Sequence, residues 1–341
     1  MVMPLLTRRR FTSLSSSLGV VALGGGHIGG AFAAGGDPIK IATVSGVYAQ
    51  TVNRLLLNQG YLQQFGLDPS FTLVADGSKI IGSLLSGELD VCMTSGFPQV
   101  LPAIEKGGRM KILATASNAV MSVIYSGKSD VKSIKDLKGR TVGIGSLGAM
   151  VHIYMVALLR KAGVDERSVN FVNIGGNVEI FRAVTAGVVD AGPGEPQFMQ
   201  ELDKYKIHVI SEIYKELPEF VGQASYAATK VITERRDVLV RTLAAYRRLY
   251  RFIQLGDSRD AWIKARSEAM GRDESTEGLN QWNLIRRNNL MPVDLVMPSE
   301  KVMYMQDLNK SLDIQQKIIS YEEAADMSLA REAALLEEKT R

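Results

Sequence analysis

The sequence is poor in the residues that form thiol, redox and metal sites: its 341 residues include one cysteine and three histidines. A single cysteine excludes an internal disulfide. Cys92 follows Val91 in an apolar run, which predicts a buried thiol, and a nucleophilic thiol needs a base beside it. His27, His152 and His208 are isolated from one another in the sequence. We therefore expect no cofactor, no metal site and no thiol catalysis.

The sequence also lacks the apolar run of about 20 residues that a membrane-spanning helix needs. Its beginning carries three arginines within Thr7–Phe11, then a weakly apolar Ser/Gly-rich run and small residues at Ala31–Ala34. This is the pattern of a twin-arginine export signal followed by its cleavage site. We predict that residues 1–34 are a signal peptide and that the mature protein is soluble and periplasmic.

Excess charge of either sign is missing from the remainder of the chain. The net charge of +4 falls near +1 without residues 1–34, because removing their three Arg from 40 basic residues leaves 37 against 36 acidic ones. This balance argues against nucleic acid as a partner. The arginines between Arg235 and Arg251 alternate with acids and apolar residues, which favours a solvated helix face.

The segment Arg140–Tyr154 reads as a short strand, a Gly/Ser turn and a helix. The start of such a helix offers free backbone N–H groups to an anion or polar ligand. Gly143, Gly145 and Gly148 also match the dinucleotide fingerprint. That reading is disfavoured, because the next strand, 169–174, ends without the acidic residue that would hold a ribose.

The chain contains an internal repeat. Residues 84–91 (LLSGELDV) align with 184–191 (VTAGVVDA) at an offset of 100, and both halves share the order strand, turn, helix, strand, turn, helix, Gly, strand, Asp. Such a repeat indicates two α/β units, each a sheet flanked by helices. We predict lobe 1 at 37–118 plus 226–341, and lobe 2 at 119–225. The lobes are joined by an extended crossover at 112–126 and a second crossing at 222–229.

Ligands in open α/β sheets bind at the carboxyl ends of the strands. Strands are expected over 89–93 and 188–191, among others, and in both predicted lobes the ends of the strands are rich in Gly, Ser, Thr and Pro and poor in charge. Two such edges that face each other form a cleft that can close on a small ligand. Helices are expected near 48–65, 233–255, 258–270, 275–288 and 299–311, with Thr233 as an N-cap, followed by a surface helix from Glu322.

Three features give the chain a resemblance to the periplasmic solute-binding proteins of ABC importers. They are the opening strand Ile39–Ala42, the segment Ser133–Val142 (SIKDLKGRTV), and the paired Gly-x-x-Asp elements that end at Asp90 and Asp190. The chain is most similar to the nitrate/sulfonate/taurine and thiamine-precursor-like (SsuA-like) group. The resemblance implies the type II periplasmic-binding-protein fold, a two-strand hinge, a ligand between the lobes, a permease as partner, a monomer and no covalent chemistry.

The resemblance also implies a set of ligand contacts at the ends of strands and on the crossings. These are Ser45, Gly46, Tyr48, Thr94, Ser95, Gly96, Ser117, Asn118, Ser146, Gly148, Ala149, Glu195 and Tyr226. Asp90 and Asp190 are expected to be structural, bonding amides near the strand ends. The hydroxyl groups suit a sulfonate-like or nitrate-like anion, whereas Glu195 suits a nitrogenous compound. A flat ring could be flanked by Tyr48, Phe97 and Tyr226.

Two other functions remain open at the level of the sequence. The first is an enzyme on the same scaffold, similar to the desulfinases or the pyrimidine-synthesising relatives. Such enzymes use Cys or His in the cleft, and this chain has no reactive-looking Cys there. The second is a ligand-sensing partner of a membrane receptor, which no sequence feature separates from a transport component.

Overall fold

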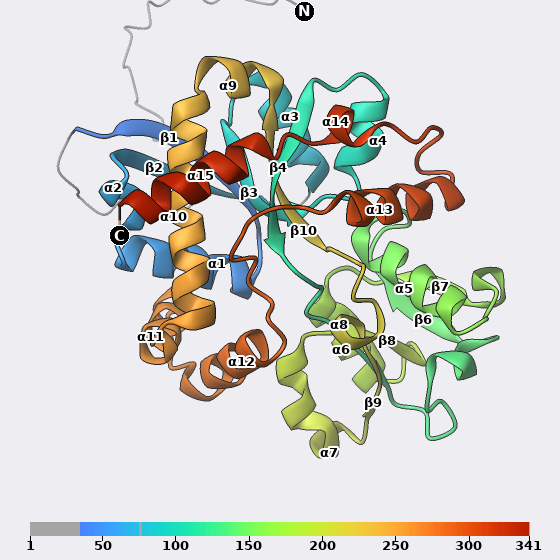
Figure 1. The fold of residues 1–341 in the computed structure, drawn as a ribbon. Helices are drawn as coiled ribbons and strands as arrows, with labels where there is room; N and C mark the ends of the chain where they lie inside the picture. Colours follow the sequence, from blue (N-terminus) through green and yellow to red (C-terminus); the bar gives the residue numbers. More distant parts are fainter. Residues whose placement is uncertain (1–34, 75–76, 341) are drawn as a thin grey trace, which may run out of the picture.

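The computed structural model describes residues 35–74 and 77–340, so the predicted signal peptide lies outside the described residues. The chain forms two five-stranded sheets flanked by helices (Figure 1). The first sheet has the order β2-β1-β3-β10-β4, with β1 parallel to β2 and β3, and β10 antiparallel to β3 and β4. Its strands are β1 Asp37–Val44, β2 Leu67–Val74, β3 Val91–Gly96, β4 Met110–Ser117 and β10 Gln223–Ala228.

The second sheet repeats this topology, with the order β7-β6-β8-β5-β9. Here β6 is parallel to β7 and β8, and β5 is antiparallel to β8 and β9. Its strands are β5 Val123–Ser126, β6 Thr141–Ile144, β7 Asn170–Asn173, β8 Ala191–Gly194 and β9 His208–Glu212. In each sheet, the strand with two antiparallel neighbours, β10 or β5, is the one that the chain enters when it arrives from the other sheet.

The two aspartates of the repeat perform the same structural task. The carboxylate of Asp90 accepts a hydrogen bond from the backbone N–H of Lys40 at 2.8 Å, and that of Asp190 accepts from the N–H of Thr141 at 2.9 Å. The backbone N–H of Asp90 donates in turn to the carbonyl oxygen of Lys40, and that of Asp190 donates to the carbonyl oxygen of Thr141. Each aspartate therefore fixes the start of β3 or β8 beside the central parallel strand, which explains why the motif occurs in both halves.

Helices pack on both sheets and fill most of the C-terminal part. The α-helices are α1 Val47–Asn58, α2 Tyr61–Gln64, α3 Gly77–Ser86, α4 Val100–Glu105, α5 Met150–Lys161, α6 Asn177–Thr185, α7 Leu202–Tyr205, α8 Ile213–Glu216, α9 Thr229–Glu234, α10 Arg236–Leu255, α11 Arg259–Met270, α12 Ser275–Arg287, α13 Ser299–Ser311, α14 Tyr321–Ala324 and α15 Ser328–Lys339. The short 3₁₀ helices are η1 Ile134–Leu137, η2 Glu166–Ser168 and η3 Pro196–Glu201. Among the described residues, no helix is long and apolar enough to cross a membrane.

Two boundaries differ from the sequence-based expectations. The helix expected over 48–65 is divided into α1 and α2, because Gly60 adopts a left-handed φ of 63° between them. Thr233 is no N-cap: it lies inside α9 and its hydroxyl donates to the carbonyl oxygen of Thr229. The helix that follows begins at Arg236, and Arg235 precedes it.

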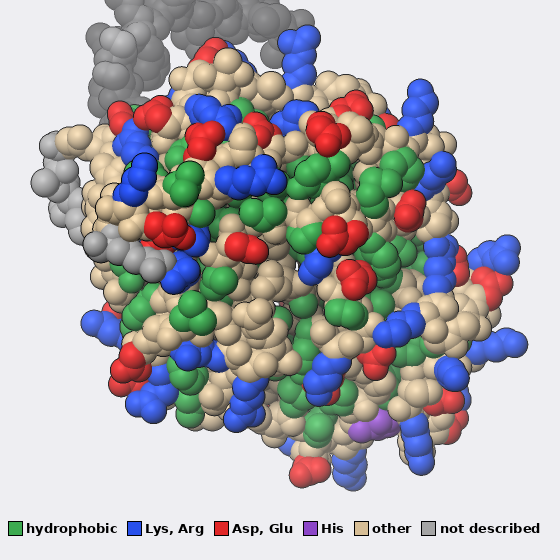
Figure 2. Space-filling model, in the orientation of Figure 1, with side chains coloured by type: hydrophobic (Ala, Val, Ile, Leu, Met, Phe, Trp, Pro, Cys, Tyr) green, Lys and Arg blue, Asp and Glu red, His purple; other side chains and the backbone are tan. Residues whose placement is uncertain are grey.

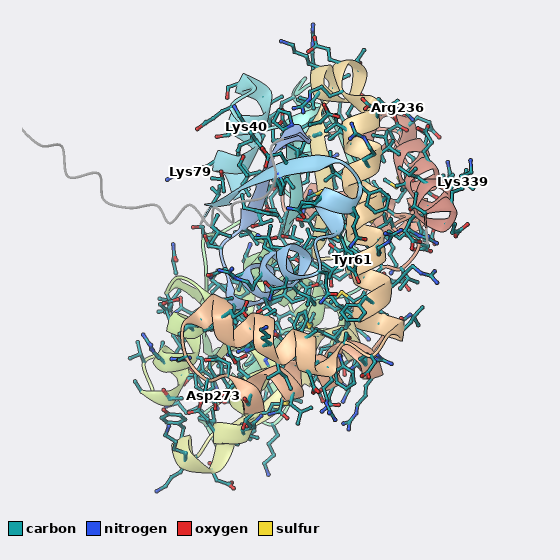
Figure 3. All side chains as sticks on the ribbon, turned by 90° about the vertical axis from the view of Figure 1, so that its left-hand side faces the viewer. Lys40, Tyr61, Lys79, Arg236, Asp273 and Lys339 are labelled. Atoms are coloured by element: carbon teal, nitrogen blue, oxygen red, sulfur yellow. The ribbon has the colours of Figure 1, made fainter. Side chains whose placement is uncertain are left out.

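The C-terminal helix is also more buried than a surface helix. Helix α15 packs along α10 (Figures 1 and 3) and buries Leu329, Ala330 and Ala333. The α10 arginines are not all solvated either: Arg247 is buried and forms an ion pair with the buried Glu337. On the face drawn in Figure 2, Lys and Arg side chains are interspersed with Asp and Glu, in keeping with a near-neutral chain.

The chain passes between the sheets twice, from β4 to β5 through residues 118–122 and from α8 to β10 through 217–222. We propose that the sheets are the cores of two lobes with the predicted boundaries, 37–118 plus 226–341 and 119–225. These boundaries assign the first three residues of β10, 223–225, to lobe 2, although β10 lies between β3 and β4 in the first sheet.

Candidate functional site

A cavity of about 780 Å³ lies where the two sheets and the C-terminal helices meet. Its wall comes from the end of β1 and the start of α1, from both crossing segments, and from the residues that follow β8. A further part of the wall comes from α12 and the residue that follows it. The cavity thus lies beyond the carboxyl ends of the parallel strands β1 and β8, as expected for open α/β sheets.

Five of the thirteen predicted contact residues line this cavity: Ser45, Gly46, Tyr48, Ser117 and Glu195. The first three follow β1, where the strand ends and α1 begins. Ser117 ends β4, and its hydroxyl already donates to the carbonyl oxygen of Ala119 at 2.7 Å. Glu195 follows β8 directly, so its side chain enters the cavity at the carboxyl end of that strand.

The remaining eight are not among the lining residues: Thr94, Ser95, Gly96, Asn118, Ser146, Gly148, Ala149 and Tyr226. Three of them belong to the packed interior, because β3 continues through Thr94 and Ser95 to residue 96, and both residues and Tyr226 of β10 are fully buried. Asn118 donates to the carbonyl oxygens of Asn289 and Met291, which anchors the segment after α12 to the first crossing. The role of these eight residues in ligand binding remains a prediction.

Two backbone N–H groups of the turn before α5 form hydrogen bonds within the turn and with α5. The backbone N–H of Gly148 donates to Nδ1 of His152 at 3.1 Å, and that of Ala149 donates to the carbonyl oxygen of Ser146. Burial lowers the pKa of His152, which favours the neutral ring that accepts this bond. Two of the amides expected to face an anion are therefore already paired, and Met150 is the residue of this segment that reaches the cavity.

Glu195 is the acidic residue among the described residues that line the cavity. Burial raises the pKa of its carboxyl group, while the nearby charge of Arg266 lowers it and that of Glu274 raises it. Its backbone carbonyl accepts a hydrogen bond from the hydroxyl of Tyr125 at 2.8 Å, which fixes the chain at the end of β8. Within the described residues, its carboxylate forms no hydrogen bond or ion pair with the protein.

Aromatic and apolar side chains complete the wall. The ring centroid of Tyr48 lies 6.3 Å from that of Trp262, and the hydroxyl of Tyr154 lies 3.4 Å from that of Ser122. Burial raises the pKa of both Tyr48 and Tyr154, so both phenols are neutral at physiological pH. Tyr214 also lines the cavity. The three phenol rings provide flat apolar surface, and those of Tyr48 and Tyr154 add neutral hydroxyl groups.

The sequence-based prediction did not include the contribution of α12. Asn280, Gln281, Asn283 and Arg287 line the cavity from this helix, and Asn288 does so from the position after it. The helical spacing of positions 280, 283 and 287 is a signal that could have identified them, because it places three polar side chains on one face. Amides are neutral, so this face adds hydrogen-bonding groups to the cavity with a single charge, that of Arg287.

The comparisons with known proteins agree with this architecture. A family model described as NMT1/THI5 like matches residues 57–254, more than half of the chain. The chain belongs to the NMT1/THI5-like family. The match begins in α1 and ends in α10, and so includes the whole second sheet and both crossings. It confirms the resemblance stated from the sequence motifs, while no curated protein matches the sequence.

Solved structures share the fold of this NMT1/THI5-like protein over most of its length. The alkanesulfonate-binding protein SsuA from Xanthomonas axonopodis pv. citri, bound to MOPS, is 15% identical, with a TM-score of 0.68 over 86% of this chain and 100% of that chain. The periplasmic aliphatic sulphonate binding protein SsuA from Escherichia coli is 17% identical, with a TM-score of 0.69 over 85% and 92%. The desulfurization enzyme DSZB is 14% identical, with a TM-score of 0.63 over 88% and 99%. These similarities show the periplasmic-binding-protein fold and so confirm the predicted fold class.

Cys92 is separate from the cavity. It lies in β3, is fully buried, and is not among the cavity-lining residues. Burial raises the pKa of its thiol to about 12. The thiol is therefore protonated at neutral pH, and a protonated thiol is a poor nucleophile.

Proposed function

We propose that this NMT1/THI5-like protein is the periplasmic substrate-binding component of an ABC importer. It captures a small organic ligand between its lobes, and the ligand's interactions with both lobes favour the closed form that docks on an inner-membrane permease. The cavity between the two sheets supports this function, as does the fold shared with proteins named periplasmic binding proteins. Export by a twin-arginine signal and a monomeric state belong to the same proposal.

The proposed ligand class rests on the carboxylate of Glu195. A half-buried carboxylate that has no partner among the described residues is stabilised by a ligand that brings an ammonium, an amidinium or another N–H donor. The amide side chains and tyrosine rings around it suit a flat compound with several hydrogen-bonding atoms. We therefore favour a nitrogenous or aromatic compound. A sulfonate-like or nitrate-like anion is the second candidate, because Lys215 and Arg287 also line the cavity.

We propose that the protein is not an enzyme. DSZB shares the fold, which keeps catalysis on this scaffold as the alternative. The argument against it is that Cys92 is protonated and lies outside the cavity. Turnover of a bound compound would favour the enzyme, and a bound compound without a partner permease would favour a sensing role.

Thermal shift of the protein without residues 1–34 tests the proposal. The compounds are sulfonates, nitrate, pyrimidines, polyamines and aromatic acids. A ligand at a hundred times its Kd adds about 2.7 kcal/mol to the free energy of unfolding. With an unfolding entropy of about 2.1 cal/mol/K per residue, a folded part of about 300 residues gains roughly 4 °C in midpoint.

Two variants make this test specific. Glu195→Gln should lose the response to a nitrogenous compound, because it removes the charge and keeps the shape of the side chain. Glu201→Gln is the matched control, since Glu201 pairs with Lys204 and does not line the cavity. The absence of a shift with any compound would contradict the proposal, and an equal response in Glu195→Gln would contradict the role of Glu195.

A further inference from the structure

A buried arginine beside the cavity connects the two proposed lobes. Arg266 of α11 is 1% exposed, and its guanidinium donates to Oε2 of Glu274 from Nε at 3.0 Å and from Nη2 at 2.8 Å. It also donates to Oε1 of Gln281 at 2.7 Å and to Oε1 of Gln197 at 3.1 Å. Gln281 lies on α12 and Gln197 in η3 after β8, and both line the cavity.

Hydrogen bonds on two sides hold the guanidinium of Arg266 in place. Glu274 is 2% exposed, and its second carboxylate oxygen accepts a hydrogen bond from Nε of Arg272 at 2.6 Å. The backbone N–H of Glu274 donates to the hydroxyl of Ser267 at 3.1 Å, which connects the turn after α11 to that helix. Arg266 is thus held by an anchored carboxylate on one side and by two amides on the other.

The chemistry of arginine dictates how the two amides are turned. A guanidinium has five N–H donors and no acceptor, whereas a glutamine amide has one acceptor oxygen and one NH₂ group. Gln197 and Gln281 must therefore present their oxygens to Arg266. Among the described residues, neither NH₂ group has a hydrogen-bond partner.

We propose that Arg266 is a positioning residue that presents the NH₂ groups of Gln197 and Gln281, one from each side of the cleft, to an acceptor atom of the ligand. The ligand then carries two complementary parts: an N–H or cationic part at Glu195, and a carbonyl, carboxylate, sulfonate or ring-nitrogen acceptor at the two amides. Gln281 belongs to the proposed lobe 1 and Gln197 to the proposed lobe 2, so closure of the lobes brings the two amides onto one acceptor. This inference rests on the proposed function and narrows its ligand class.

Stability in the absence of any ligand tests the orientation of the amides. Gln281→Glu keeps an oxygen for Arg266 and makes the hydrogen bond charge-assisted, whereas Gln281→Leu leaves a buried donor without a partner. We expect the thermal midpoint of Gln281→Glu to be several degrees above that of Gln281→Leu. The reverse order would overturn the orientation, because it would mean that position 281 does not accept from Arg266.

Binding of two small probes, measured by titration NMR, tests the presentation of the NH₂ groups. Benzoate has acceptors only, and benzylamine has an ammonium group only. In the double variant Gln197→Glu/Gln281→Glu, the affinity for benzoate should fall at least tenfold, while that for benzylamine stays equal or rises. Arg266→Lys should also weaken benzoate several-fold, because an ammonium cannot bridge two amides and a carboxylate in the fixed geometry of a guanidinium.

Gln64→Glu is the matched control, since Gln64 accepts from Arg248 at 2.9 Å at the surface, outside the cavity. It should leave both probe affinities unchanged. Unaltered benzoate affinity in the double variant, or no benzoate binding to the unmodified protein, would overturn the inference. Benzylamine binding that is lost in Glu195→Gln would in either case preserve the role of Glu195 in the proposed function.

Discussion

Replacing Glu337 by alanine should destabilise the protein far more than a change near the end of a terminal helix usually does. Its side chain is 2% exposed, and its carboxylate lies 2.5 Å from Nη1 of Arg247, whose side chain is 8% exposed. Nε of Arg248 and Nε of Arg251 lie 3.8 and 4.0 Å from the same carboxylate. Glu337→Ala removes the buried partner of the Arg247 guanidinium, which keeps only the exposed Glu338 as a counter-charge, and takes away the anion between three arginines.

Breaking a buried ion pair by removing one partner costs about 3–5 kcal/mol, because the remaining charge stays out of water uncompensated. For a folded part of about 300 residues the entropy of unfolding is roughly 0.6 kcal/mol/K, so the midpoint should fall by about 5–8 °C. Differential scanning calorimetry of the ligand-free protein measures both the midpoint and the enthalpy.

The neighbouring residue provides the control. Glu338 also pairs with Arg247, with 3.0 Å between Oε1 and Nη2, but its side chain is 52% exposed. Solvent screens such a pair, so Glu338→Ala should cost less than about 1 kcal/mol. The double variant Arg247→Met/Glu337→Leu should recover part of the loss, since it leaves neither buried charge unpaired. Equal midpoints for Glu337→Ala and Glu338→Ala would refute this reasoning.

Three further predictions concern the sheets and the cavity. Asp90→Ala and Asp190→Ala should each cost about 1.5–3 kcal/mol in calorimetry, because each removes a charged acceptor from a strand amide. Gly192→Ala should cost about 1–3 kcal/mol, since its Cβ would lie 2.5 Å from an α6 side chain, while Gly82→Ala, with open space around its Cβ, should gain about 0.5–1 kcal/mol. The raised pKa of Glu195 means that the folded state binds the proton more tightly than the unfolded state; its contribution to stability is therefore complete below the ordinary glutamate pKa of about 4.3 and is lost as the pH rises through the raised value. The midpoints of Glu195→Gln and the unmodified protein should thus be similar near pH 4 and diverge in favour of the variant by pH 7, and parallel curves would contradict this.

The duplicated architecture was predictable because its determinants are local. Gly87 and Gly187 follow α3 and α6 with φ values of 80° and 71°, a left-handed conformation in which glycine has the lowest cost. Asp90 and Asp190 follow at the same distance and bond the central strands. Since each signal acts within a few residues or across one strand pair, the pattern of letters was sufficient to identify both units.

The cavity was less predictable, because its composition depends on where strands end. Strand β3 was expected to end at Met93 but continues through Thr94 and Ser95, which places their hydroxyls in the interior. Strand β8 was expected over 188–191 but covers 191–194, so its carboxyl end falls directly before Glu195. A shift of three residues in the end of a strand therefore decides whether a polar side chain lies in the core or lines the cavity.

The polar face of α12 was not identified for a different physical reason. Asn and Gln on one side of an amphipathic helix are the normal signature of a surface that faces water. Only tertiary packing distinguishes water from a cavity on that side. The connection from Asn118 to the backbone after α12, at Asn289 and Met291, joins positions more than 170 residues apart, and no local pattern specifies it.

The two sheets have the same topology, and β5 and β10 are the strands that follow the two crossings. This arrangement explains why the cavity lies at the crossings. Ser117 and Ser122 border the first crossing, Gly222 and Gln223 end the second, and all four line the cavity. A change in the angle between the sheets must alter the backbone of these segments, since they are the two covalent connections between the sheets. In the proposed function, contacts of a ligand with the same segments would act directly on the equilibrium between open and closed arrangements, with no need for a signal through the rest of either sheet.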